Sequence, residues 1–284
     1  MHEAGARLAA VGAPDPQRDA RWLLREAAGL SAAALGAALK DPAPEAVAAR
    51  FEAMLRRRCA REPVSHILGW RDFYSRRFRI DGRALDPRPE SESVVEAALE
   101  ALPSDRPVAV LDLGVGSGCL LLSVLAERPL AQGLGVDVSE AALALAAQNA
   151  LMLEQSAAPP LRARLELRRG DWLEGVEGAF DAILCNPPYI ALDDWARLAP
   201  EPRLFEPKAA LTPGPDGLAV YRRLAPRVAA HLAPAGAAFF ETGFDQADQV
   251  ALVFTGAGLA AEVIADLGGA PRVVKARRVG NAAG

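Results

Sequence analysis

Four consecutive residues, Asn186-Pro187-Pro188-Tyr189, carry the most specific candidate chemistry in this sequence. They follow the apolar run 180–185, which is typical of a buried strand, and two successive prolines end that strand in a stiff, extended turn. Because proline has no N–H, the turn is rich in acceptors, namely the Asn186 side-chain oxygen and the Pro187 carbonyl. Together with the Tyr189 ring, these acceptors are suited to hold a planar –NH2 group. Taken alone, the motif is equally well explained as a loop that ends a strand.

A glycine-rich loop lies upstream of this motif, at the end of another apolar run. The loop consists of Gly114, Val115, Gly116, Ser117 and Gly118. Glycines there let a ligand approach the backbone, where a side chain would clash. The dinucleotide-binding fingerprint requires glycine at its first, third and sixth positions, but here the sixth position is Cys119. The spacing therefore indicates a tighter loop around a nucleoside that has no pyrophosphate.

Three further polar or aromatic side chains follow the ends of expected strands. Asp137 ends the second strand, where a carboxylate can accept hydrogen bonds from both ribose hydroxyls. Asp171 and Trp172 follow the third strand and offer an acceptor and a ring that can flank adenine. Each signal is weak alone, but together with Asn186 they occur on successive strand ends. We therefore predict one nucleoside-dependent site at that edge of the sheet.

The elements that must position these residues alternate between strand and helix from residue 107 onward. Strands are expected at 108–113, 133–138, 165–168, 180–185, 235–241, 259–266 and 272–276. Helices are expected at 117–127, 139–153, 216–232 and 246–255. No helix separates the last two strands, which predicts an antiparallel pair at one edge. The pattern indicates an α/β fold with a doubly wound, mostly parallel seven-stranded sheet, whose ligands bind at the carboxyl ends of the strands.

The residues before this unit predict a small helical domain and a hairpin linker. Capping signals at Asp15-Pro16, Ser31 and Pro44 begin three helices. Residues 73–85 alternate roughly and contain the turn dipeptide Asp81-Gly82, which predicts a β-hairpin, and Ser91 is expected to cap the next helix. The expected domains are 1–74, 75–92 and 93–284. The helical part either docks a substrate or packs as a cap, and the sequence leaves both interpretations open.

Composition and charge exclude several classes of protein. The formal net charge is −4, which is unlike a free nucleic-acid binder, although residues 1–90 carry a net +4. The basic residues 56–58 and 71–79 face either solvent or an acidic partner. The few cysteines and histidines are scattered, which argues against a metal site and a disulfide framework. With no secretory signal and no apolar run long enough to cross a bilayer, we expect a cytoplasmic protein without membrane contact.

The sequence resembles the release-factor glutamine methyltransferases, the PrmC/HemK family of class I S-adenosylmethionine-dependent methyltransferases. The resemblance covers nearly the whole chain and includes the helical part. Its most specific segments are 63–69, 71–74 and 87–92, which generic methyltransferases lack. It also extends to 205–207, 210–211, 216–218, 266–267 and 272–274. Asp86, Ser91, Val115 and 213–215 depart from the usual family pattern, which affects loop details rather than the chemistry.

The resemblance implies an activity, a cofactor and a partner. The expected cofactor is S-adenosyl-L-methionine, held by the glycine loop, Asp137, Asp171, Trp172 and Asn186, with S-adenosyl-L-homocysteine as product. The expected substrate is the glutamine of the Gly-Gly-Gln motif in class-1 peptide chain release factors. Asn186 and the Pro187 carbonyl would hold its amide for direct in-line transfer, beside Pro188 and Tyr189. We expect a monomer without direct nucleic-acid contact.

Three alternatives stay open at this point. A glutamine of a ribosomal protein is a second protein substrate that fits the same motif. The amino groups of adenine or cytosine in nucleic acid are also planar, although the acidic second part of the chain disfavours them. A non-catalytic cofactor-binding module is the third alternative.

Overall fold

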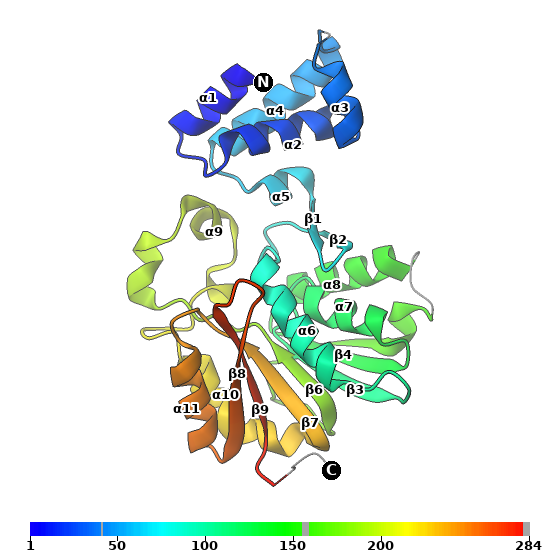
Figure 1. Cartoon of the computed structure of the whole chain (residues 1–284), viewed down its shortest axis with the longest axis vertical. Helices are drawn as coiled ribbons and strands as arrows, with labels where there is room; N and C mark the ends of the chain where they lie inside the picture. The colour runs from blue at the N-terminus through cyan, green and yellow to red at the C-terminus, as the bar shows by residue number, and fades with distance from the viewer. Residues whose placement is uncertain (41, 155–158, 281–284) are drawn as a thin grey trace. The chain divides into compact units, whose positions relative to one another are not determined.

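The structure is a computed structural model that describes residues 1–40, 42–154 and 159–280. The chain divides into two compact units (Figure 1). The first contains Met1–Trp70 together with Ala199–Phe205, and the second contains Arg71–Leu198 and Glu206–Gly284. Among the described residues, no helix is long and apolar enough to cross a membrane.

The second unit is built on a seven-stranded sheet with the order β5-β4-β3-β6-β7-β9-β8. The strands are β3 (Val108–Leu113), β4 (Ala131–Asp137), β5 (Leu165–Arg169), β6 (Phe180–Cys185), β7 (Leu232–Glu241), β8 (Leu259–Ala265) and β9 (Pro271–Arg278). The pairs β3–β4, β3–β6, β4–β5 and β6–β7 are parallel, whereas β9 is antiparallel to both β7 and β8. The predicted doubly wound sheet with an antiparallel pair at one edge is therefore confirmed.

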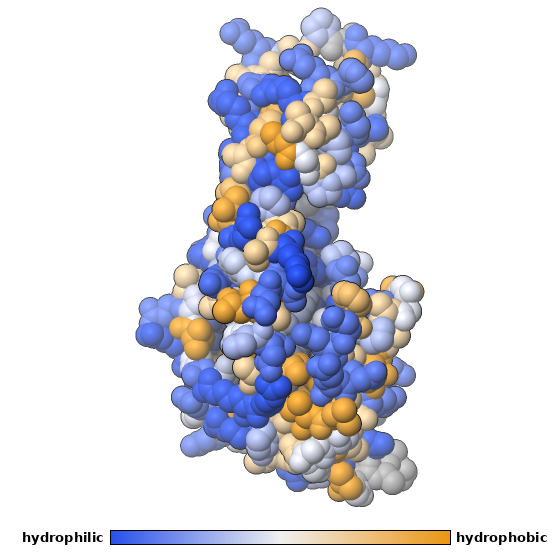
Figure 2. All heavy atoms as spheres, turned by 90° about the vertical axis from the view of Figure 1, so that its left-hand side faces the viewer, coloured by the Kyte–Doolittle hydropathy of each residue, from blue (hydrophilic) through white to orange (hydrophobic). Residues whose placement is uncertain are grey.

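Helices cover both faces of this sheet (Figure 1). Successive side chains of a strand point to opposite faces of the sheet. Both sets are apolar in these strands, so each face packs against helices. The helices are α6 (Glu92–Ala101), α7 (Cys119–Glu127), α8 (Glu140–Leu153), α10 (Ala219–His231) and α11 (Ala247–Gly256). On one face, Val110, Leu184 and Phe239 pack in the core cluster that includes α6 and α7. On the other, Leu111 and Phe240 pack in the cluster that includes α10 and α11. Figure 2 shows a surface of mixed polarity, in which apolar residues form only small groups.

The first unit is a small helical bundle. Its helices are α1 (His2–Ala10), α2 (Pro16–Ala28), α3 (Ala32–Ala38), α4 (Glu45–Cys59), α5 (Val64–Leu68) and α9 (Pro200–Phe205). The predicted caps are in place: Asp15 accepts the Arg18 N–H at the start of α2, and Ser31 accepts the Ala34 N–H at the start of α3. The sequence did not predict α1, α5 or α9.

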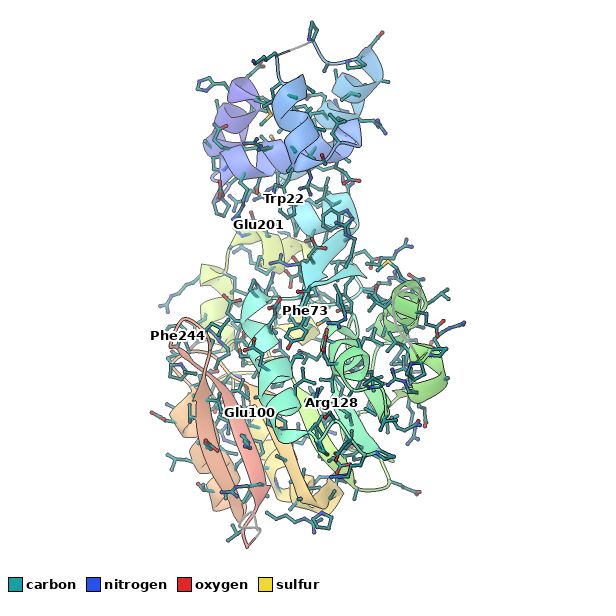
Figure 3. All side chains as sticks on the ribbon, turned by 45° about the vertical axis from the view of Figure 1, so that its right-hand side comes forward. Trp22, Phe73, Glu100, Arg128, Glu201 and Phe244 are labelled. Atoms are coloured by element: carbon teal, nitrogen blue, oxygen red, sulfur yellow. The ribbon has the colours of Figure 1, made fainter. Side chains whose placement is uncertain are left out.

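An ion cluster ties α9 into this helical bundle. Arg58 donates to Asp19 at 2.8 Å and to Glu201 at 2.9 Å, and Arg61 pairs with the same glutamate at 2.7 Å. Figure 3 labels this glutamate, which belongs to α9. The Arg58 side chain is only 4% exposed. The sequence predicted that the basic residues 56–58 face either solvent or an acidic partner. Arg58 faces neither, because its side chain is buried in this ion cluster.

The β-hairpin forms earlier than predicted. Its strands are β1 (Trp70–Phe73) and β2 (Arg76–Arg79), so the turn falls at Tyr74 and Ser75 and the assignment to Asp81-Gly82 was wrong. Both turn residues have positive φ, 47° and 57°, which is costly for side chains other than glycine. A tertiary hydrogen bond from the Tyr74 N–H to Glu92 Oε1, at 2.8 Å, stabilises this turn.

Candidate active site

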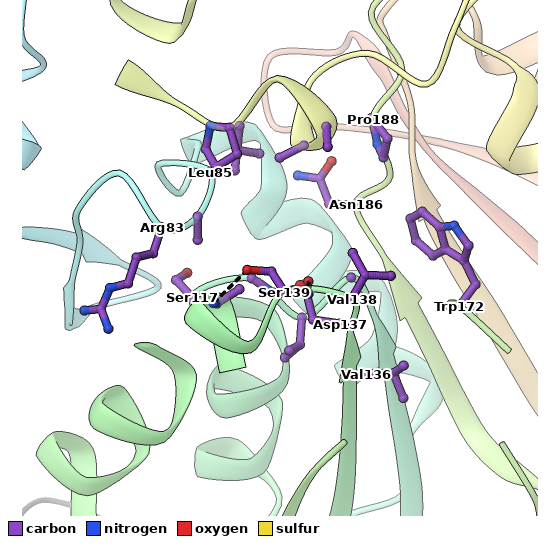
Figure 4. A pocket seen from close by; sticks show the side chains of 18 of the residues that line it. Arg83, Leu85, Ser117, Val136, Asp137, Val138, Ser139, Trp172, Asn186 and Pro188 are labelled. Atoms are coloured by element: carbon purple, nitrogen blue, oxygen red, sulfur yellow. Dashed lines mark hydrogen bonds between the residues drawn. The ribbon is translucent and has the colours of Figure 1, made fainter. Parts of the chain in front are cut away.

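One cavity of about 710 Å³ lies where β3, β4, β5 and β6 end (Figure 4). This volume is within the range of small-molecule sites. All residues of its wall belong to the second unit. The wall includes residues 114–117 of the glycine loop, residues 136–139 at the end of β4, Gly170 to Trp172 after β5, and Asn186 after β6. The successive strand ends therefore converge on one site, as the sequence predicted.

The glycine loop and Asp137 form one rigid wall of the cavity. The Gly116 N–H donates to Asp137 Oδ2 at 3.0 Å, and the Ser139 N–H donates to Asp137 Oδ1 at 2.9 Å. Both carboxylate oxygens are thereby oriented, and each keeps a lone pair for a further donor. Gly116 has a φ of 54°, a conformation that side chains with a Cβ rarely adopt. The arrangement presents an acceptor beside a backbone that a ligand can approach closely.

Asp171 and Trp172 contribute a paired charge and an aromatic ring. Arg223 on α10 donates to both Asp171 oxygens, at 2.8 and 2.7 Å, so this carboxylate is neutralised rather than free. The Trp172 ring lies close to the glycine loop. A Cβ atom added at Gly114 would be only 3.3 Å from a carbon of that ring. The ring therefore borders the part of the cavity next to the loop.

Asn186 is oriented by a residue outside its own turn. Its Nδ2 donates to Ser91 Oγ at 3.1 Å, which leaves Oδ1 as the end of the amide available to a ligand. Ser91 makes no helix-capping hydrogen bond, so the prediction that it caps α6 was wrong. Its hydroxyl binds Asn186 instead. Both residues belong to the cavity wall.

Tyr189, the last residue of the N-P-P-Y turn, does not belong to this wall, whereas Pro188 does. The Tyr189 hydroxyl donates to Glu241 Oε1 at 3.3 Å, and Gln246 donates to the Tyr189 carbonyl at 3.0 Å. Gly217, whose φ is 72°, passes so close that a Cβ there would lie 2.2 Å from that carbonyl oxygen. Only glycine fits at this position, which gives a structural reason for the Asp-Gly-Leu motif at 216–218.

A second group of wall residues covers the site opposite the strand ends. It consists of residues in segments 82–91 and 207–213. An ion pair joins these segments, because Arg88 donates to Glu206 at 2.6 Å and the Glu206 side chain is 1% exposed. Asp86, which departs from the family pattern, is buried and accepts from Arg71 at 3.0 Å. An arginine therefore accommodates the buried carboxylate at that position.

The structure brings most of the predicted site residues together. Gly114, Val115, Gly116, Ser117, Asp137, Asp171, Trp172, Asn186 and Pro188 line the cavity. Gly118, Pro187 and Tyr189 do not belong to its wall. Gly118 has a φ of 81° and begins α7, which is a structural role.

Asn149 on α8 is a positioning residue that the sequence analysis missed. It is fully buried, and its Nδ2 donates to the Ser117 carbonyl at 2.8 Å and to the Arg79 carbonyl at 3.1 Å. Its Oδ1 accepts the Arg79 N–H at 2.7 Å. It therefore ties the glycine loop to β2. The only sequence signal was a polar residue inside an Ala/Leu helix.

The donor and acceptor set of the cavity fits a nucleoside better than a metal ion. An oriented carboxylate, an exposed backbone loop and an aromatic ring match ribose and base. Among the residues that the structure describes, no group of three or more His, Cys, Asp or Glu side chains is arranged to hold a metal. The dimensions and chemistry of the site therefore suit a nucleoside ligand.

Comparisons with known proteins agree with this geometry. The sequence model of the PrmC N-terminal domain matches residues 1–69, and that of the methyltransferase small domain matches residues 93–223. The release factor glutamine methyltransferase of Cereibacter sphaeroides is 49% identical, over 98% of this chain and 96% of the relative. That of Caulobacter vibrioides is 43% identical, over 94% and 91%.

A solved structure shows the same fold. The hMettl16 catalytic domain, crystallised with an RNA hairpin, matches with a TM-score of 0.54 and 13% identity, over 72% of this chain and 76% of that chain. The sheet order, the glycine loop after β3 and the flanking helices define a class I methyltransferase fold. Given the relatives above, the chain belongs to the release factor glutamine methyltransferase family.

Proposed function

We propose that this protein transfers a methyl group from S-adenosyl-L-methionine to the side-chain amide nitrogen, N5, of a glutamine. The proposed substrate is the glutamine of the Gly-Gly-Gln motif in class-1 peptide chain release factors. Besides the family, one observation carries the proposal: Ser91 engages the Asn186 amide nitrogen, so the Asn186 oxygen is free to accept an N–H in the cavity. An acceptor at this place suits an amide NH2 group as substrate.

The proposed cofactor site uses the wall residues that the strand ends bring together. Asp137 would accept hydrogen bonds from the ribose hydroxyls, and the Trp172 ring would border the adenine. The glycine loop would allow close approach of the backbone. When bound, S-adenosyl-L-methionine supplies a methyl group activated by its attachment to a sulfonium. S-adenosyl-L-homocysteine is the product, and the methylated nitrogen releases one proton to solvent.

The role proposed for the N-P-P-Y turn is orientation. A glutamine amide nitrogen is a poor nucleophile, because its lone pair is conjugated with the carbonyl. Asn186 Oδ1 would accept one of its N–H groups. The carbonyl of Pro187, which stands in the chain between the wall residues Asn186 and Pro188, would accept the other, and this directs the lone pair toward the methyl group. Holding two reactants in a reactive geometry lowers the barrier by removing translational and rotational freedom before the reaction. Fixed acceptors in a site shielded from water add electrostatic stabilisation.

A methyl-transfer assay with labelled cofactor tests this function. The purified protein is incubated in parallel with a class-1 release factor, ribosomal proteins and DNA. We expect label on the release factor only, and no label on a release factor whose Gly-Gly-Gln glutamine is replaced by alanine. Label on a ribosomal protein or on DNA instead would contradict the proposed substrate. Absence of transfer to all three, together with cofactor binding in calorimetry, would indicate a non-catalytic binding module.

A further inference from the structure

Ser91 lies between Asn186 and a buried carboxylate at the end of β7. Asn186 donates to the Ser91 hydroxyl at 3.1 Å, and the Ser91 side chain lies close enough to Glu241 to lower the pKa of that carboxyl. Among the described residues, Glu241 Oε2 is buried without a hydrogen-bond partner. The Tyr189 hydroxyl donates to Glu241 Oε1 at 3.3 Å. Ser91 and Glu241 are 2% and 1% exposed, so bulk water does not compete for these bonds. One carboxylate therefore accepts from Tyr189 and lies next to the serine that holds Asn186.

The direction of these hydrogen bonds decides which end of the Asn186 amide faces the cavity. An ionised carboxylate only accepts, and a serine hydroxyl has one proton to donate. When Glu241 is ionised, its Oε2 is an acceptor to which Ser91 can donate its proton, and Ser91 then presents only lone pairs to Asn186. The NH2 end of the Asn186 amide must then point to Ser91, and the oxygen points the other way.

We propose that Glu241 is a positioning residue that, acting through Ser91, keeps the Asn186 oxygen directed at the substrate amide. This inference rests on the function proposed above. If Glu241 cannot accept the Ser91 proton, Ser91 can donate to the Asn186 oxygen, and the amide can turn over. Its NH2 end would then meet the NH2 group of the substrate, and two donors do not form a hydrogen bond.

The proposed role of Glu241 requires its ionised form, so the rate of methyl transfer should depend on pH. Burial raises the pKa of Glu241 to about 7, although hydrogen bonds from Ser91 and Tyr189 and the charge of Arg272 lower it. Below this pH the carboxyl group is protonated, so it can donate a hydrogen bond as well as accept one. Methyl transfer is therefore expected to slow as the pH falls through about 7, and to reach its full rate above it.

Other titratable groups surround Glu241 and must be separated from it by experiment. The groups that act on it, or on which it acts, are Glu90, Tyr189, Arg272, Cys119, Cys185 and Tyr221. Burial also raises the pKa of Asp112 on β3 to about 7. A step in the rate near that pH is therefore assigned to Glu241 only if a variant at Glu241 removes it.

The test compares Glu241→Gln with Ser91→Ala, Ser91→Thr and a matched control, Glu262→Gln, whose side chain lies exposed on β8. The single-turnover rate of methyl transfer to the release factor is measured from about pH 5.5 to 9, which brackets the expected titration. Cofactor affinity is measured by calorimetry. The substitution Glu241→Gln keeps the size of the side chain but allows it to donate as well as accept.

We expect Glu241→Gln to lower the rate at pH 8 by about 10²-fold, the effect of losing one oriented partner of the reacting group. The step near pH 7 should disappear, while cofactor affinity stays nearly unchanged. Ser91→Ala should show the same loss, Ser91→Thr should recover most of that loss because threonine keeps a hydroxyl, and the control Glu262→Gln should behave as the unmodified protein.

The outcomes separate this inference from the proposed function. If the unmodified protein does not methylate the release factor, the proposed function fails, and the inference fails with it. If it does, but Glu241→Gln keeps both its rate and its pH step, the role of Glu241 is refuted and the function stands. A parallel loss of rate and cofactor affinity would show a merely structural effect and would also refute it. Should Glu241→Gln not fold, an unchanged rate in Ser91→Ala would overturn the inference.

Discussion

Replacing Asn186 with alanine tests the catalytic assignment directly. The substitution removes the oxygen proposed to accept a substrate N–H, and it also removes the 3.1 Å hydrogen bond to Ser91. Loss of one oriented polar group at a reacting centre lowers kcat by about 10²–10³-fold, or about 2.7–4 kcal/mol. Loss of the Ser91 bond lowers the free energy of unfolding by only about 1 kcal/mol. The change in kcat should therefore far exceed any change in stability.

The assay measures single-turnover methyl transfer with saturating cofactor and release factor. Calorimetry gives cofactor affinity, and urea denaturation gives the free energy of unfolding. Asn186 is one residue of a cavity wall that many segments build, so we expect cofactor affinity to weaken only modestly. A near-normal kcat in Asn186→Ala would refute the idea that this oxygen orients the substrate. An equal loss of rate and cofactor affinity would place Asn186 in the cofactor site alone.

Three other substitutions test the surroundings of the site. Gly116→Val puts a β-branched residue at a φ of 54° in the cavity wall, so calorimetry should detect no cofactor binding; unchanged affinity would mean that the cavity is misassigned. Arg88→Ala leaves the buried Glu206 carboxylate without its partner at 2.6 Å. The free energy of unfolding, measured in urea, should fall by about 2–3 kcal/mol. The double variant Arg88→Ala/Glu206→Met should recover most of this loss. Gly217→Ala should reduce kcat more than the control Gly175→Ala. Both glycines have φ near 70°, but only position 217 lies against the Tyr189 carbonyl of the N-P-P-Y turn. Equal effects would show that backbone strain alone matters.

The sheet and the edge that carries the cavity were predictable because their signals are local. Alternating or continuous apolar runs that end in glycine or proline mark strand ends within a few residues. In a parallel sheet the carboxyl ends of neighbouring strands meet at one edge. Gly116, Asp137 and Asn186 could therefore be assigned to one site before any contact was known, and the structure places all three in one cavity wall.

Predictions from local sequence signals were wrong where a hydrogen bond to a distant residue fixes the conformation. Asp81-Gly82 is the stronger turn dipeptide, yet the hairpin turns at Tyr74, whose N–H is held by Glu92. Ser91 has the residue type of a helix cap, but its hydroxyl binds Asn186. In both cases a hydrogen bond between residues 18 or more positions apart determines the conformation, and no local pattern contains that information.

The sequence by itself determined the order of the strands along the chain, the chemistry at their ends and the family. Only the tertiary structure decided how that chemistry is directed. The Asn186 oxygen faces a substrate only if something fixes the opposite end of its amide, and that partner, Ser91, lies 95 positions away. Burial of Glu241, which makes its carboxylate sensitive to pH near neutrality, likewise exists only once β7 is packed inside the sheet.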